Sequence, residues 1–174
     1  MSGNWYILYT KPGQEKKVST QLSKKGYESF CPLNYPCSNT ADRKRFNGEP
    51  LFPRFVFVYL AESQILTIRN FTGVIQLVHW LSKPAIIKDD EIRVIREFTR
   101  IHNNIDISKS FVDSQEDCMV TTVPFMQGDK HSIAPRKAII KVFLPSLGFT
   151  MTAQAEQEEI SHMPLIKSGL KMVS

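Results

Sequence analysis

The chain has 174 residues, of which 42% are apolar and 10% aromatic, enough to form the core of one medium domain or two small ones. Its formal net charge of +5 suggests an anionic partner. No apolar run approaches the ~18 residues of a membrane span, and the N-terminus lacks the charged and apolar regions of a signal peptide, so we expect a cytoplasmic protein with no membrane partner.

The residues that usually carry chemistry do not form a catalytic or metal-binding motif. Cys31, Cys37 and Cys118 are scattered without the paired spacing of a structural zinc site, which fits a reducing compartment. The 4 histidines lie far apart, and there is no phosphate-binding loop or nucleophile motif. We therefore expect no enzymatic activity, no metal and no cofactor.

The N-terminal part of the chain alternates between strand and helix patterns. Large apolar side chains on both faces predict a strand over residues 5–9. Apolar residues four apart predict a helix over 14–25, and Gly26 is placed to cap its C-terminal end. A short strand is expected over 27–32.

Residues 35–50 are a polar excursion between two apolar runs, which predicts a loop or an extended hairpin. The segment LFPRFVFVYL follows at residues 51–60 and is apolar on both faces, as is typical of a central strand. One face would carry Phe55, Phe57 and Tyr59, and the other Val56, Val58 and Leu60.

The next segments continue the alternation of helices and strands. A short helix is predicted over residues 62–70 and a strand over 74–80. A longer helix to residue 102 follows, with Asp89 or Asp90 as its N-cap. The first domain therefore reads as an α+β fold.

Residues 106–116 have little apolar periodicity and predict a linker between a first domain over 1–105 and a second over 117–174. Beyond the linker the pattern becomes one of short strands, which favours a small β-barrel. The strands are expected over residues 119–123, 138–144 and 149–155, with a turn at 145–148.

Three segments of the first domain together resemble the N-terminal domain of NusG-family proteins. They are WYILYTKPGQEKKV near the N-terminus, EPLFPRFVFV at Glu49–Val58, and GVIQLVHW with KPAII at Gly73–Ile87. Three motifs in the family's order are jointly specific. Within the family they look most like the specialised antiterminators, the RfaH-like proteins and the Bacteroides capsule-locus regulators.

The second domain resembles the KOW domain of the same family through VTTVPFMQGDKHSI and KVFLPSLGFTMTA. It departs from the family pattern at Val123, where a glycine usually stands. The resemblance implies an N-terminal domain with a mainly antiparallel sheet flanked by helices, followed by a small SH3-like (KOW-like) β-barrel.

The resemblance also implies a function. Such factors bind the clamp helices of the RNA polymerase largest subunit through an apolar depression, and they suppress pausing or termination, in specialised members at particular operons. Their second domain recruits a ribosomal protein or a termination factor. We expect the protein to act as a monomer.

Aromatic residues that match family positions lining or supporting the polymerase-binding depression form the first set of candidates. Aromatic anchors in a groove suit such a contact, although strand aromatics also pack as ordinary core. This set is Tyr9, Phe52, Pro53 and Phe55, with His79 and Trp80 on a neighbouring strand as further candidates.

Basic residues form the second set of candidates, for contact with non-template DNA or nascent RNA. The resemblance places Lys11, Lys17, Gln21 and Lys24 toward the DNA, and the last three share one helical face. Arg43, Lys44 and Arg45 lie in the polar loop. A solvated charged surface is the alternative for both groups.

Two other functions stay open at this point. An RNA-binding or ribosome-associated module would use the basic helix and the barrel without polymerase. A small uncharacterised enzyme would need a polar pocket that the sequence does not indicate.

Overall fold

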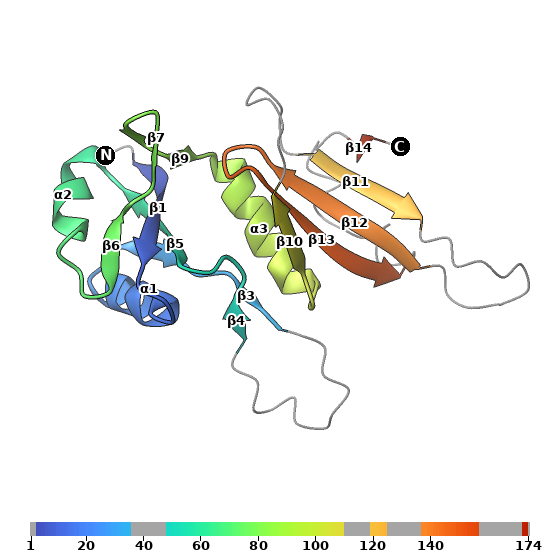
Figure 1. Cartoon of the computed structure of the whole chain (residues 1–174), viewed down its shortest axis with the longest axis horizontal. Helices are drawn as coiled ribbons and strands as arrows, with labels where there is room; N and C mark the ends of the chain where they lie inside the picture. The colour runs from blue at the N-terminus through green and yellow to red at the C-terminus, as the bar shows by residue number, and fades with distance from the viewer. Residues whose placement is uncertain (1–2, 36–47, 110–118, 125–136, 157–171, 174) are drawn as a thin grey trace, which may run out of the picture. The chain divides into compact units, whose positions relative to one another are not determined.

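The computed structural model describes residues 3–35, 48–109, 119–124, 137–156 and 172–173 (Figure 1). The chain divides into two compact units, Met1–Arg96 and Glu97–Ser174. In the described residues no helix is both long enough and apolar enough to cross a membrane.

The first unit is built around an antiparallel sheet with strand order β2-β5-β1-β6, in which β9 also pairs with β1. Its main strands are β1 (Asn4–Thr10), β2 (Glu28–Phe30), β5 (Phe55–Leu60), β6 (Val74–Leu77) and β9 (Ile86–Ile87). Strand β5 lies between β2 and β1, so the prediction of a central strand is confirmed. The mainly antiparallel sheet expected for the first domain is also confirmed.

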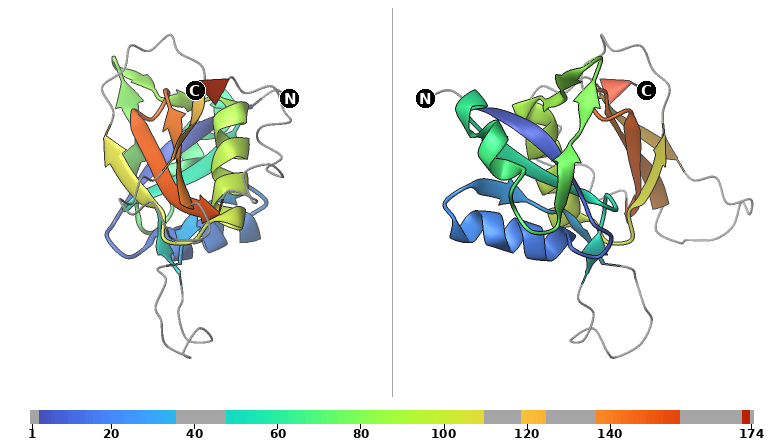
Figure 2. Two further views of the ribbon diagram at one scale, coloured as in Figure 1. Left: turned by 90° about the vertical axis from the view of Figure 1, so that its right-hand side faces the viewer. Right: turned by 60° about the vertical axis from the view of Figure 1, so that its left-hand side comes forward.

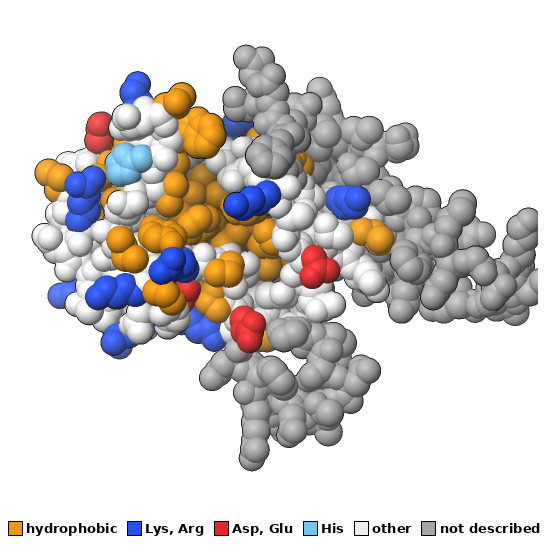
Figure 3. Space-filling model, in the orientation of Figure 1, with side chains coloured by type: hydrophobic (Ala, Val, Ile, Leu, Met, Phe, Trp, Pro, Cys, Tyr) orange, Lys and Arg blue, Asp and Glu red, His pale blue; other side chains and the backbone are white. Residues whose placement is uncertain are grey.

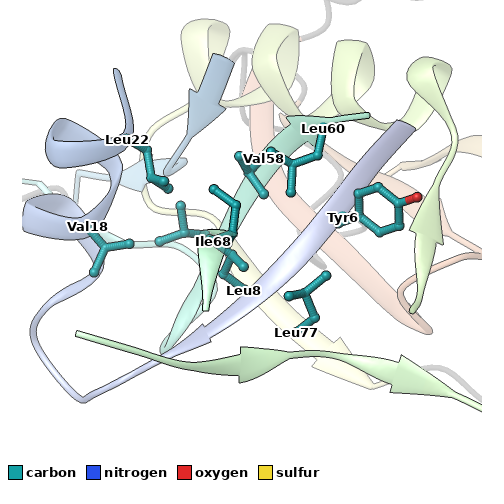
Figure 4. Close-up of a cluster of buried hydrophobic side chains, with 9 residues drawn as sticks. Tyr6, Leu8, Val18, Leu22, Val58, Leu60, Ile68 and Leu77 are labelled. Carbon is teal, nitrogen blue, oxygen red and sulfur yellow. The ribbon is translucent and has the colours of Figure 1, made fainter. Parts of the chain in front are cut away.

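Helices α1 (Glu15–Lys24) and α2 (Ile65–Ile68) supply the apolar side chains that cover one face of this sheet. A short 3-10 turn, η1 (Glu62–Gln64), precedes α2. Figure 2 shows α1 running across the strands in its right-hand view. Figure 4 shows the shared core, which consists of Tyr6, Leu8, Val18, Leu22, Val56, Val58, Leu60, Ile68 and Leu77.

The C-terminal end of α1 depends on a glycine. Gly26 has φ +85, which suits glycine because it has no Cβ. The amide of Gly26 donates to the carbonyl of Ser23, and the amide of Tyr27 donates to that of Leu22. This is the Schellman pattern of helix termination, and it confirms the predicted cap.

The opposite face of the sheet carries aromatic side chains, which we call the aromatic face. Its rings pack in pairs: Trp5 on Tyr59, Tyr9 on Phe55, and both Phe30 and Phe52 on Phe57. The guanidinium carbon of Arg96 lies 5.2 Å from the ring centre of Trp5 and 5.1 Å from that of Phe30. Arg96 also pairs with Glu28 at 2.9 Å.

Arg96 belongs to α3 (Asp89–Ile101), whose start differs from the prediction. Asp89 and Asp90 lie inside the first turn of the helix, and Lys88 precedes it. The Glu91 carboxylate reaches back to accept a hydrogen bond from the Lys88 amide at 3.3 Å. Negative side chains in the first turn favour the positive end of the helix dipole, so the cap residue itself need not be acidic.

The strand expected over 74–80 is interrupted at Val78. Strand β6 ends at Leu77, and residues 79–84 form a separate hairpin of β7 (His79–Trp80) and β8 (Lys83–Pro84). The Ala85 amide donates to the Val78 carbonyl at 2.9 Å and closes the base of this hairpin. The hairpin arises because Leu81 and Ser82 both take positive φ, as a two-residue primed turn requires.

The polar excursion begins and ends as an antiparallel pair, as an extended hairpin would. Strand β3 (Leu33–Asn34) pairs with β4 (Glu49–Pro50). Arg43, Lys44 and Arg45 lie outside the described residues.

The second unit contains a sheet in the order β10-β13-β12-β11-β14. Its strands are β10 (Asp106–Lys109), β11 (Met119–Pro124), β12 (Lys137–Leu144), β13 (Phe149–Glu156) and β14 (Met172–Val173). The three strands expected from the sequence are confirmed as β11, β12 and β13. Buried side chains of this sheet include Ile140, Val142, Leu144, Met151 and Ala153.

Two features of the second unit differ from the sequence expectations. Strand β10 occupies the first residues of the expected linker, because its backbone pairs with β13 from Asp106↔Thr152 to Lys109↔Phe149. The residues of β10 alternate little in hydropathy, so their sequence did not indicate a strand. Among the described strands, β10 and β14 are the two ends of the sheet and do not pair, so no closed barrel is found.

Candidate functional site

The C-terminal end of β1 lies beside a tight turn that leads into β5. In this turn the amide of Phe55 donates to the carbonyl of Phe52 at 3.1 Å, Pro53 is the second residue, and Arg54 is the third with φ +69. This is the arrangement of a type II turn, whose third position favours glycine. An L-residue there costs about 1–2 kcal/mol of local strain.

The backbone of Arg54 is held by hydrogen bonds from two elements. Its amide donates to Oε1 of Glu15 at 2.8 Å, and its carbonyl accepts from the amide of Thr10 at 2.8 Å. The Thr10 hydroxyl donates to the same carbonyl at 3.2 Å. Glu15 and Thr10 are both buried, so these bonds fix the turn against α1 and β1.

Tyr9 and Phe55 are direct partners in the β1–β5 pairing and lie at the free end of the aromatic face. Their ring centres are 6.1 Å apart at an interplanar angle of 62°, and both side chains are half-buried. The guanidinium carbon of Arg54 lies 4.9 Å from the ring centre of Tyr9, and its Nη1 donates to the Tyr9 hydroxyl. We call Tyr9, Pro53, Arg54 and Phe55 the aromatic corner.

The polymerase-binding candidates therefore fall into different environments. Tyr9 and Phe55 are partly accessible, and Pro53 is exposed. Phe52 is only 2% exposed and packs edge-on against Phe57 at 5.7 Å between ring centres. The structure thus makes Phe52 a support of the aromatic face rather than a surface residue.

His79 and Trp80 are not brought to the aromatic corner. The last contact before their hairpin is the bond from the Val78 amide to the Ile7 carbonyl. After the hairpin, the chain rejoins the sheet where Ile86 pairs with Tyr6. Trp80 is 73% exposed near the hairpin tip, and Nδ1 of His79 lies 2.8 Å from the Leu77 carbonyl oxygen. The two residues form a separate exposed surface.

Sequence reasoning missed Arg54. The signal was a charged residue inside an aromatic run directly after a proline, in LFPRF. Proline at the second position of a turn predicts a third residue with special backbone geometry, but which side chain it contacts depends on β1, forty-five positions away in sequence.

The basic candidates on α1 share one side of the helix, as predicted. Lys17 and Lys24 are exposed and Gln21 is half-buried, and we call these three residues the α1 stripe. Within the ranges that the structure describes, neither lysine has a carboxylate at ion-pair distance. Lys11 is exposed just beyond β1, and its amide donates to the Gly73 carbonyl at 2.9 Å.

Figure 3 shows apolar side chains gathered on one face of the molecule, with lysine and arginine side chains at their margin. The described residues contain no group of three or more His, Cys, Asp or Glu side chains that could hold a metal ion. Two features of the described surface that suit binding are the aromatic corner and the exposed basic side chains.

Cys31 is expected to react slowly with thiol reagents in the native protein. Burial and, to a lesser degree, the Glu15 carboxylate raise the pKa of its thiol from 9.0 to about 11. At pH 8 this lowers the reactive thiolate fraction by about 100-fold relative to the unfolded chain. Labelling kinetics of a Cys37→Ser, Cys118→Ser variant, with and without urea, measure this ratio.

The same shift predicts a dependence of stability on pH. Because the folded thiol keeps its proton to higher pH than the unfolded one, its contribution is fully present below pH 9 and is lost between about pH 9 and 11. Cys31→Ala should flatten that part of the stability curve. Equal labelling rates in the native and unfolded protein would contradict the raised pKa of Cys31 on which both predictions rest.

Comparison with known proteins agrees with this architecture. A family profile described as Transcription termination factor nusG matches residues 3–96, which is more than half of the 174 residues. The chain belongs to the NusG family. NusG proteins are transcription elongation and termination factors and generally bind RNA polymerase.

A solved structure described as "Domain interaction in Thermotoga maritima NusG" is similar to most of the chain. The TM-score is 0.52 at 19% sequence identity, and the match covers 90% of this chain and 94% of that chain. At this identity the similarity concerns the fold. The match extends past residue 96 and so includes part of the second unit.

Proposed function

We propose that this NusG-family protein binds elongating RNA polymerase through its aromatic corner, with the clamp helices of the largest subunit as the partner. Binding there would suppress pausing or termination. The observation that carries this proposal is the half-buried Tyr9–Phe55 pair at one end of an aromatic face whose Phe52 and Phe57 rings are buried. Accessible aromatic rings on a rigid support suit an amphipathic helix. The protein would act by binding and not as an enzyme.

The α1 stripe would contact nucleic acid in the same complex, as non-template DNA or nascent RNA. Its two lysines are exposed and have no described carboxylate partner. Lysine is a point charge without a planar fork, so the stripe would position a phosphate backbone rather than recognise bases. Lys11 would extend the same contact.

The motifs LFPRFVFV and KPAII support a specialised antiterminator, related to the RfaH-like and Bacteroides capsule-locus factors and acting at particular operons. The second unit would be a KOW-like domain that recruits a ribosomal protein or a termination factor. We propose a monomeric, cytoplasmic protein.

Binding of purified polymerase to the full chain tests the proposal. Phe55→Ala or Tyr9→Ala is expected to weaken the affinity by about 30-fold, as for a hot-spot residue worth about 2 kcal/mol. Tyr59→Ala is the matched control, because Tyr59 is half-buried on the same face of β5 but packs against Trp5 at the far end. Circular dichroism establishes that each variant is folded.

The same experiment distinguishes the proposed function from its main alternative, an RNA-binding or ribosome-associated module. Such a module would bind RNA through the α1 stripe and would show no affinity for polymerase. Equal affinities of the Phe55→Ala, Tyr9→Ala and wild-type proteins for polymerase would show that the aromatic corner is not the contact.

A further inference from the structure

The geometry of the turn that contains Arg54 does not require an arginine at this position. It is the third residue of the Phe52–Phe55 turn and has φ +69, where glycine is favoured. The bonds that hold the turn use only its backbone amide and carbonyl. Glycine could make the same bonds without strain, so the turn does not explain the side chain.

The guanidinium of Arg54 is only partly satisfied by the described residues. Nη1 donates to the Tyr9 hydroxyl, and the group lies over the Tyr9 ring. The Nε atom is buried and has no hydrogen-bond partner within the described part of the chain. The nearby Glu15 carboxylate bonds the Arg54 amide, and no described carboxylate forms an ion pair with the guanidinium.

The remaining N–H donors of the Arg54 guanidinium suit one kind of ligand, a carboxylate. With Nη1 bonded to Tyr9, the edge of the guanidinium formed by Nε and Nη2 remains, and this edge presents two parallel N–H groups. A carboxylate accepts both at once in a bidentate pair. Arg54 as a whole is half-buried rather than fully enclosed, and its guanidinium lies over the ring of Tyr9.

We infer that Arg54 is the receptor for an acidic side chain, aspartate or glutamate, on the polymerase helix that packs on the aromatic corner. This inference rests on the function proposed above. The half-buried rings of Tyr9 and Phe55 favour a carboxylate on a protein helix over a nucleic-acid phosphate, because a helix also offers apolar side chains to those rings. Arg54 thereby selects a polymerase surface with an acid at that place.

The test compares full-length variants for affinity to purified polymerase at several salt concentrations, together with their thermal unfolding. Arg54→Gly keeps the turn, and Arg54→Asn is a second variant that tolerates positive φ. Both are expected to bind at least 10-fold more weakly, with a smaller dependence on salt, while the unfolding temperature stays equal or rises. Arg54→Lys keeps the charge but not the fork, and it should restore only part of the affinity.

The controls separate the possible failures. If Arg54→Gly and Arg54→Asn bind polymerase within twofold of wild type while Phe55→Ala binds weakly, the inference is wrong and the proposed function stands. If the wild-type protein itself does not bind polymerase, the proposed function fails and the inference with it. Loss of affinity for single-stranded DNA with unchanged polymerase binding would identify a phosphate receptor instead, and would also overturn the inference.

Discussion

The Phe57→Ala variant is expected to lose about 3–5 kcal/mol of unfolding free energy. Phe57 is fully buried in the middle of β5 and is the ring on which both Phe30 and Phe52 pack. Removing it leaves a cavity beneath two aromatic side chains from different segments, which the surrounding strands can only partly close. A loss of this size approaches the whole stability of a small domain.

Urea denaturation followed by tryptophan fluorescence measures this loss. A Trp80→Phe background leaves Trp5 as the reporter, which is buried in the first unit and packs on Tyr59. Phe55→Ala is the control on the same strand and face, and because Phe55 is half-buried it should cost about half as much or less. A loss below about 1 kcal/mol for Phe57→Ala would show that the aromatic face is not the support that we describe.

The double variant Lys17→Glu, Lys24→Glu is expected to have the largest effect on nucleic-acid affinity. If each lysine neutralises one phosphate of a single strand, the slope of log affinity against log salt should decrease by about 1.4. Charge reversal also adds repulsion, so the proposed antitermination activity of the full chain should fall with the affinity. Fluorescence anisotropy with labelled single-stranded DNA gives the slope, and a transcription readthrough assay gives the activity.

A matched control holds the change in net charge constant. Lys83→Glu with Lys109→Glu reverses two other exposed lysines, one on the β7–β8 hairpin and one on β10. This control should retain the wild-type slope and most of the affinity. Equal losses in the two double variants would mean that the α1 stripe contributes only through the overall charge of the protein.

The strands and helices that the sequence predicted well are those whose pattern is local. In α1, Val18 and Leu22 face the core one helical turn apart, and Gly26 ends the helix with bonds inside six consecutive residues. In β5, both faces are apolar because one packs on α1 and α2 and the other carries the aromatic face. Neither feature needs knowledge of which strands are neighbours.

The elements that the sequence did not predict depend on distant partners. Strand β10 has a polar pattern and exists because β13 pairs with it. The break at Val78 depends on the hairpin whose turn is formed by Leu81 and Ser82. Primed turns favour Asn and Gly, so these two residues did not indicate a turn. Local propensity favours neither structure, and tertiary contacts decide both.

By itself the sequence determined the α+β pattern of the first domain, the place of LFPRFVFVYL in the middle of a sheet and the NusG-like order of motifs. Periodicity and glycine chemistry act over a few residues, so they can be read from the chain. Only the tertiary structure decided that Phe52 is buried, that Trp80 lies away from Tyr9, and that Arg54 lies over the Tyr9 ring. The contact of Arg54 with Tyr9 depends on the register of β1 against β5, which sets Tyr9 opposite Phe55 and is a property of two segments more than forty residues apart.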